Sequence, residues 1–394
     1  MIEGRRPNRE EQQLSTSMEH QTSYGLSYGL VPANTADICI RPCYYLLQAL
    51  GMWLPRDRRH HDGARLGKTV REIYYVLIHL LFAVSLAAVM LLDFIHYGFT
   101  FSPKGVHIAD LMNSVPTCLN LLCPYVFTRL YFSRGQYTEL VLSIQNQSTH
   151  YASKLRAKAR LYTLISVTAW CLSAAFFIFH WKPFFSRPWH YVLYIVVIIY
   201  TTGWWAVWLS IYAFVCYAHS LQIHSLVECM RSEQTSPVQV LYMHQQLRNS
   251  IDRTQRDFNF IISFAISYHA LDIIIFSFAY YDDAFGRHYA LWQYAGGVIF
   301  DLGTILVKLF PPAVLAAAVH RSLTAGARRC EVTPGSERLP KENLLLFQYM
   351  VSCERDMGLK ILGIRITVEI VGTILMTIVT AAVSFVAFVI PRLK

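Results

Sequence analysis

The sequence predicts an all-α membrane protein with seven transmembrane helices, a cytoplasmic N-terminus and an extracellular C-terminus. Three observations support this fold class. Hydrophobic residues make up 54% of the chain and charged residues only 15%, well below the roughly 25% charged residues of soluble domains. Seven apolar stretches each approach or exceed the roughly 20 residues that cross a bilayer. Most Lys and Arg residues fall in the segments on one side of these stretches.

The region before the first helix divides into two parts. Residues 1–39 are polar and rich in Ser, Asn, Gln and charge, which predicts a disordered cytoplasmic tail. Residues 40–72 begin with the amphipathic run IRPCYYLLQALGMWLP, which we expect to lie on the inner membrane surface. The helical domain follows over residues 73–390, and residues 391–394 form a short external tail.

Seven expected spans make up this domain. Their approximate bounds are 73–97, 107–128, 161–181, 189–217, 258–281, 289–319 and 366–390. The connections expected in the cytoplasm are long and helical in pattern, at 134–159, 219–256 and 341–365, with a break at Ser236-Pro237. The external loops are short. The later helices are therefore expected to extend into the cytoplasm and pack there.

The distribution of Lys and Arg gives the orientation. Of the 35 such residues, 28 lie in segments on the N-terminal side of the membrane, 6 lie on the other side, and Lys308 lies within a helix. Positive residues favour the cytoplasm, so the N-terminus is expected inside. G-protein-coupled receptors have the opposite orientation, and this chain has neither Asp-Arg-Tyr after helix 3 nor Asn-Pro-x-x-Tyr in helix 7. The net charge of +10 reflects this bias and does not indicate nucleic-acid binding.

The sequence offers no support for catalysis or a cofactor. It contains no nucleotide-binding loop, no Ser/His/Asp arrangement and no metal-binding motif. Its nine cysteines include no Cys-x-x-Cys pair, and none lies in a predicted external loop, so neither a disulfide framework nor a zinc site is expected. We predict a protein that is not an enzyme.

The last helix carries a partial motif. Thr380 and Phe388 stand where insect gustatory receptors end their seventh helix with Thr-Tyr, five mostly apolar residues and Gln-Phe. Ala381 replaces the Tyr and Ala387 replaces the Gln. The segment before helix 1 and the region 243–258 also resemble that family. The chain therefore resembles the gustatory receptors of the seven-transmembrane chemoreceptor channel superfamily in layout from residue 40 to 390.

This resemblance implies a ligand-gated cation channel, formed as a homo- or hetero-tetramer with family members and lined by helix 7. Polar and small residues of this helix share an arc of about 100° at 100° per residue. From the residues alone, close helix packing explains the arc better than a pore. The resemblance favours the pore, with Phe388 as a hydrophobic gate. The pore and gate candidates are Thr377, Thr380, Ser384, Ala387 and Phe388.

The outer halves of helices 2–6 contain aromatic and polar residues that suit a small organic, tastant-like ligand. The candidates are Asp110, His180, Tyr200, Trp204, His269, Asp272, Tyr280, Trp292 and Asp301. His269 and Asp272 lie three residues apart on one turn and form the best candidate pair. Two alternatives remain open, because Tyr and Trp residues also form belts at membrane interfaces and single polar residues can contact headgroups.

Helix 6 has two charged residues within the bilayer. Asp301 and Lys308 are seven residues apart, so they share a face. Lys308 is expected to extend its ammonium group to the inner headgroups, whereas Asp301 lies near mid-membrane. Pro311-Pro312 is expected to bend or break the helix, either as a hinge or as a static kink.

The sequence thus predicts a gustatory-type receptor channel in the cell membrane, in contact with the lipid bilayer. A non-conducting auxiliary subunit is one alternative, which Ala381 and Ala387 favour. A transporter is another, which Asp301 and the paired prolines favour, although the chain shows no inverted internal repeat.

Overall fold

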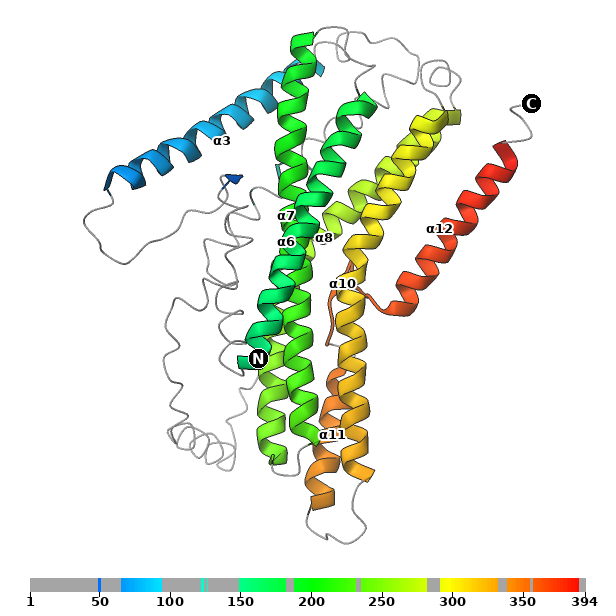
Figure 1. Ribbon diagram of the computed structural model, residues 1–394. Coiled ribbons are helices and arrows are strands. Elements are labelled where there is room, and N and C mark those ends of the chain that lie inside the picture. The colour runs from blue at the N-terminus through cyan, green and yellow to red at the C-terminus, as the bar shows by residue number, and fades with distance from the viewer. Residues whose placement is uncertain are drawn as a thin grey trace, which may run out of the picture.

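The described part of the chain is almost entirely helical. This computed structural model describes residues 49–50, 65–93, 122–123, 126, 149–181, 188–231, 235–281, 291–331, 339–354 and 357–389. The four longest helices are α6 (Thr149–Trp181), α7 (Pro188–Arg231), α8 (Pro237–Tyr281) and α10 (Leu291–Glu331). They form an elongated bundle (Figure 1). Three shorter helices pack on it, namely α3 (Arg65–Asp93) on α7, α11 (Leu339–Glu354) on α10 and α8, and α12 (Val368–Val389) on α10.

The long helices are apolar enough to cross a membrane. Candidate spans cover Ser153–Phe179, Tyr191–Arg231, Pro237–Ile274 and Gly297–Arg328, and shorter apolar segments occur at Ile73–Ala88 in α3 and Val368–Thr377 in α12. The expected span 107–128 lies outside the described residues except at 122, 123 and 126. The chain is therefore a helical, multi-pass membrane protein, while the count of seven spans and the orientation remain predictions.

Helix α7 forms the centre of the bundle because it is apolar on every side. Its 44 residues span about 66 Å, roughly twice the hydrocarbon thickness of a bilayer. Trp204, Trp208 and Tyr212 are at most 1% exposed. The rings of Trp208 and Tyr212 stack at 5.9 Å, and Phe258 of α8 packs on Tyr212 at 5.3 Å. This helix contacts α3, α6, α8 and α10.

The junction between α7 and α8 confirms the break predicted at Ser236-Pro237. Helix α8 begins at Pro237, where the missing amide hydrogen of proline is harmless because first-turn amides have no helical partner. The Ser236 hydroxyl accepts a hydrogen bond from the Gln239 amide at 3.2 Å, which caps the helix.

Helix α10 passes through Pro311 and Pro312 without interruption. The predicted break is therefore wrong, whereas a bend or static kink within the continuous helix stays a prediction. Each proline ring removes the donor for a carbonyl four residues earlier, but packing against α7, α8, α11 and α12 holds α10 in one continuous element.

A short hairpin connects α11 to α12. The helical pattern expected to 365 stops at Glu354 in the structure, and β1 (Lys360–Ile361) then pairs with antiparallel β2 (Ile364–Arg365). Leu362 and Gly363, between the strands, have φ values of 52° and 81°, as a two-residue type I′ turn requires. The side chain of Gln255 on α8 exchanges two hydrogen bonds of 2.6 Å with the Lys360 backbone. The start of α12 is thereby tied to α8.

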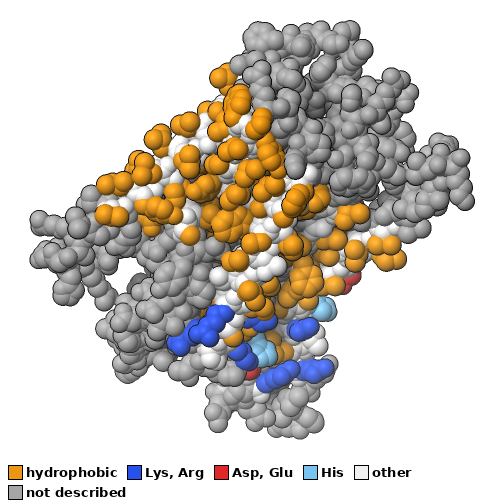
Figure 2. Space-filling model, turned by 45° about the horizontal axis from the view of Figure 1, so that its top comes forward, with side chains coloured by type: hydrophobic (Ala, Val, Ile, Leu, Met, Phe, Trp, Pro, Cys, Tyr) orange, Lys and Arg blue, Asp and Glu red, His pale blue; other side chains and the backbone are white. Residues whose placement is uncertain are grey.

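The described surface is strongly apolar over most of its length. Figure 2 shows hydrophobic side chains over the upper part of the face in view, with Lys and Arg gathered towards the lower end. Leu164, Leu172 and Phe179 of α6 are 64%, 66% and 74% exposed. Apolar side chains exposed in this way suit contact with lipid.

Candidate functional site

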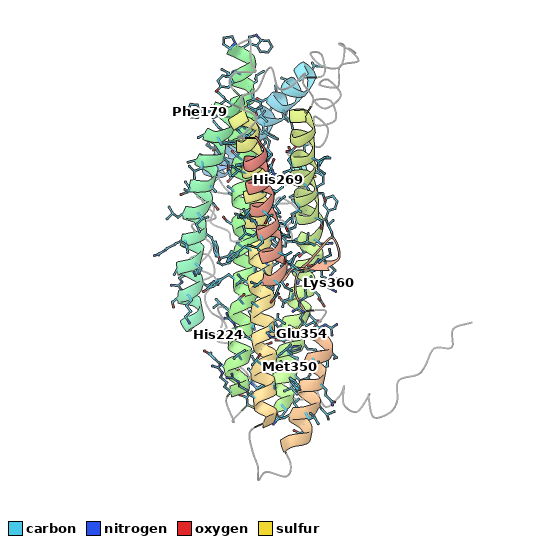
Figure 3. The ribbon with its side chains drawn as sticks, turned by 90° about the vertical axis from the view of Figure 1, so that its right-hand side faces the viewer. Phe179, His224, His269, Met350, Glu354 and Lys360 are labelled. Carbon is cyan, nitrogen blue, oxygen red and sulfur yellow. The ribbon has the colours of Figure 1, made fainter. Side chains whose placement is uncertain are left out.

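A buried polar contact joins α8 to α10. The His269 Nδ1 and the Asp301 Oδ1 form a hydrogen bond of 2.7 Å, and the two side chains are only 8% and 7% exposed. Figure 3 shows His269 inside the bundle, between the end marked by Phe179 and the hairpin marked by Lys360. A histidine and a carboxylate are rarely buried unless they are paired, so this contact locks the facing turns of the two helices together.

Asp272 completes a cluster with these two residues. It is 7% exposed and follows His269 by three positions on α8, so both side chains point to one side. One ligand atom from each of His269, Asp272 and Asp301 lies within 4.8 Å of the others. The sequence paired His269 with Asp272, and the structure adds Asp301 to that pair.

Lys308 does not reach the headgroups, so the expectation that it extends to the membrane surface is wrong. Its side chain is 1% exposed, and its Nζ lies 4.5 Å from the centre of the Trp205 ring of α7. Lys308 lies on the face of α10 that packs on α7, where Ile305 and Leu309 are also buried. A cation over an aromatic face is attracted by the partial negative charge on the face of the ring, which partly offsets the loss of hydration of the ammonium.

Aromatic rings of α6 adjoin the cluster along α10. Phe176 stacks on Phe300 at 5.0 Å with the two rings nearly parallel, and Phe177 meets Phe300 edge-on at 5.1 Å. Phe300 directly precedes Asp301. This part of the bundle therefore combines apolar faces with polar tips, the two features that a small organic ligand needs.

The candidates Tyr200 and Trp204 lie at a different contact. Both face α3, where Phe82 lies 4.3 Å from Trp204 and 6.4 Å from Tyr200 between ring centres. The Trp204 Nε1 donates to the Leu50 carbonyl at 3.4 Å. Neighbouring residues point about 100° apart on a helix, which explains why Trp205 faces Lys308 while Trp204 faces α3.

Several predicted residues are not placed. Asp110 lies outside the described residues, and the side chains of His180, Tyr280 and Trp292 are not described, nor are those of Ser384, Ala387 and Phe388 within α12. Their assignments stay predictions.

The described polar residues of α12 face outwards. Glu369, Thr373, Thr377 and Thr380 are exposed. The hydroxyls of Thr373 and Thr377 donate to carbonyls one turn earlier, both at 2.9 Å. Among the α12 side chains that the structure describes, Val371 and Ile374 pack against the core, and at 100° per residue both lie outside the polar arc. The helix lies at the edge of the bundle (Figure 1).

The fold is similar to that of a solved insect olfactory receptor. The structure of the insect olfactory receptor OR5 from Machilis hrabei in complex with eugenol superposes with a TM-score of 0.60 at 13% identity, over 89% of this chain and 97% of that one. A second structure of the same receptor gives a TM-score of 0.56 at 11% identity, over 88% of this chain and 97% of that one. No model of a known protein family matches the chain, and no curated protein matches it. At these identities the comparison shows that the chain shares the fold of this receptor.

Sequence reasoning missed the environment of Lys308. The available signal was its spacing of two helical turns from Asp301, which places both charges on one face of α10. Trp205 could not be identified as its partner, because the relative rotation of α7 and α10 depends on how the helices pack.

Proposed function

We propose that the chain is a gustatory-type chemosensory receptor that acts as a ligand-gated cation channel in the plasma membrane. It would have seven spans, a cytoplasmic N-terminus and an extracellular C-terminus. The observation that carries this proposal is the last helix of an olfactory-receptor fold, which presents exposed polar residues away from its own bundle.

The position of the stripe on α12 supports a pore. Val371 and Ile374 hold the helix on the bundle, whereas Thr373, Thr377 and Thr380 are left on the open side. The hydroxyl oxygens of these threonines can still accept hydrogen bonds, and lipid tails offer no donors for them. Neighbouring subunits in a tetramer would cover this side and enclose water along it, with Ser384, Ala387 and Phe388 continuing the lining towards the external end.

The ligand would bind near the cluster of His269, Asp272 and Asp301. Buried carboxylates accept hydrogen bonds from ligand hydroxyls, and the rings of Phe176 and Phe300 supply an apolar wall. The fold neighbour was solved in complex with eugenol, a small ligand. A small organic compound is therefore the class of ligand that we propose for this chain.

Patch-clamp recording tests the function directly. Cells expressing the chain alone should show cation currents evoked by members of a panel of phenols, sugars and bitter compounds, and untransfected cells should show none. Surface labelling in the same cells establishes that the chain has reached the membrane. Silence across the panel, despite surface expression, would count against a channel formed by this chain alone.

An auxiliary subunit is the second candidate. Ala381 and Ala387 remove two polar side chains that the gustatory motif has in this helix. A chain of this kind would pass current only together with a conducting relative, and co-expression with such a relative would then change that partner's current.

Cross-linking tests the assembly. A cysteine at Ser384 is expected to form a disulfide between subunits under mild oxidation, because the stripe faces the axis of the tetramer. A cysteine at Val386, on the opposite side of α12, is the matched control and should stay monomeric on a non-reducing gel. Equal cross-linking at both positions, or none at Ser384, would contradict a central α12.

Asp272→Asn tests the ligand site. The substitution keeps the shape of the side chain and removes its charge, so a hydrogen bond of about 1.5–3 kcal/mol to the ligand weakens. The half-maximal concentration should rise about tenfold to a hundredfold, with unchanged surface expression. Asp252→Asn, on the same helix but with a side chain 46% exposed, should leave the dose-response curve in place. A normal curve for Asp272→Asn would remove Asp272 from the site.

A further inference from the structure

The cluster of His269, Asp272 and Asp301 is short of positive charge. It holds two buried carboxylates, and Lys308 is the buried cation near it on α10. One ammonium balances one carboxylate, and the imidazole of His269 already uses its Nδ1 in the contact with Asp301. An unbalanced carboxylate inside a membrane is strongly disfavoured, so the cluster favours the uptake of a cation.

The donor set indicates which cation. One imidazole nitrogen and two carboxylate oxygens, with ligand atoms within 4.8 Å of one another, can converge on a single ion after small changes of side-chain rotamer. Ca²⁺ and Mg²⁺ prefer sites made of oxygen alone, whereas imidazole suits Zn²⁺ and its first-row neighbours. A zinc centre with three protein ligands keeps its fourth position for water.

Lys308 provides a second, independent indication of a bound group. Its Nζ is buried and finds no hydrogen-bond acceptor among the described residues. Helical side chains lean towards the N-terminus of their helix, and Asp301 lies two turns earlier than Lys308 on the same face of α10. A water or hydroxide on the metal would supply the acceptor that this ammonium lacks. With hydroxide, the charges of the cluster, the ion and Lys308 balance.

We propose that His269, Asp272 and Asp301 bind one divalent transition-metal ion of the zinc class. The ion would join α8 to α10 in the half of the bundle that holds the candidate ligand site, with Lys308 donating to its water or hydroxide ligand. This site uses the same three side chains as the candidate ligand site, but its test does not depend on the receptor function proposed above.

Metal binding is measured on the full chain, purified in detergent and stripped with a chelator. Co²⁺ serves as the probe because its visible absorption reports the ligands around it, and Zn²⁺ should displace it. We expect one equivalent of Co²⁺ per chain and a Zn²⁺-dependent rise in the thermal unfolding temperature, since a ligand that binds only the folded state stabilises it. A folded chain that binds no Co²⁺ would overturn the proposal. A proton on one of the two carboxylates would then supply the missing positive charge.

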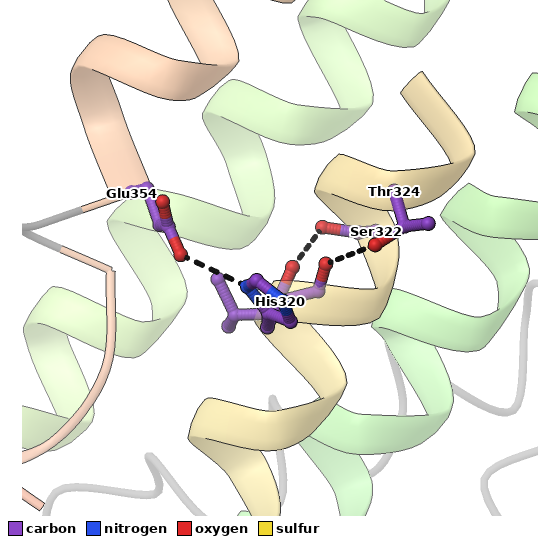
Figure 4. Close-up of polar contacts among 5 residues, drawn as sticks. His320, Ser322, Thr324 and Glu354 are labelled. Atoms are coloured by element: carbon purple, nitrogen blue, oxygen red, sulfur yellow. Dashed lines mark hydrogen bonds and ion pairs between the residues drawn. The ribbon is translucent and has the colours of Figure 1, made fainter. Parts of the chain in front are cut away.

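Variants locate the ion. His269→Gln removes a direct ligand of the ion. It should therefore weaken Co²⁺ binding by about 100-fold or more, at least as much as the largest losses that follow changes in the groups around metal ligands. The matched control is His320→Gln. His320 also contacts a carboxylate, that of Glu354 at 3.4 Å (Figure 4), but its side chain is 73% exposed. Unchanged Co²⁺ affinity in His269→Gln would overturn the site.

Asp272→Cys tests the site by a gain in Cd²⁺ affinity, a result that misfolding of the variant would not produce. Thiolate is a soft ligand, so this variant should bind Cd²⁺ at least tenfold more tightly than the parent chain does, with a thiolate-to-metal absorption band. A folded Asp272→Cys chain with the parent's Cd²⁺ affinity would contradict the proposal. Neither readout requires current, so a failed metal site and a failed channel can be told apart.

Discussion

Replacing Asp301 by Leu is expected to lower the stability of the folded chain by about 3–5 kcal/mol, the usual consequence of removing one partner of a buried charge pair. The substitution leaves the Nδ1 of His269 without the acceptor that now lies at 2.7 Å. It also removes the carboxylate two turns before Lys308 on the same face of α10, whose ammonium-bearing side chain is 1% exposed. Denaturant titration in detergent micelles and surface labelling of cells would measure the loss.

A second substitution shows whether charge causes this loss. Combining Asp301→Leu with Lys308→Met removes both charges and replaces them with apolar groups, which is often neutral in a protein interior. The double variant should therefore recover most of the stability. The single control Asp252→Leu removes a carboxylate 3.9 Å from Arg248 in a half-exposed pair, and it should change stability by less than about 1 kcal/mol. No recovery in the double variant would mean that Asp301 acts through packing or through His269 alone.

Composition and periodicity predicted most of the helices that the structure describes. A chain this apolar needs helices to satisfy its backbone in lipid, and Ser236-Pro237 ends one helix and begins the next by a local rule. The prolines of α10 show the limit of such rules. Pro311 and Pro312 predict an interruption from local chemistry, whereas contacts with four other helices keep α10 continuous.

The candidate site could be predicted only where its residues share a helix. His269 and Asp272 are neighbours on α8 by spacing alone. Their contact with Asp301, and that of Lys308 with Trp205, depend on how α8 and α7 rotate against α10. No periodicity within one segment reports that rotation. Lys308 was expected at the headgroups because the length of its side chain permits it, but packing placed that face of α10 against α7.

The hairpin before α12 has a similar explanation. Gly363 is a recognisable turn residue, but the pairing of β1 with β2 involves only two residues from each strand. Gln255, 105 positions earlier, bonds the Lys360 backbone. Contacts between such distant positions arise from the tertiary fold and leave no local pattern.

Phe388→Ala is expected to open the pore without ligand and to raise the basal current several-fold. The proposal places one Phe388 ring from each subunit around the external end of the pore. Such a constriction stays dry, because an ion would have to lose its water to cross it. Alanine would widen and wet that ring. Ala387→Gln should restore the amide of the gustatory motif beside it and change ion selectivity or conductance, with little effect on assembly.

Phe385→Ala is the matched control for this gate, since it removes the same ring one turn earlier. At 100° per residue, Phe385 lies about 60° beyond the edge of the polar arc, so this variant should keep a low basal current. Whole-cell recording compares the three chains at equal surface expression. Parental basal and evoked currents in Phe388→Ala would place Phe388 against lipid or a neighbouring helix. The match to the gustatory motif would then not identify Phe388 as a gate. A rise in both phenylalanine variants would point instead to general loosening of α12, because the two rings have the same volume and differ only in the direction they face.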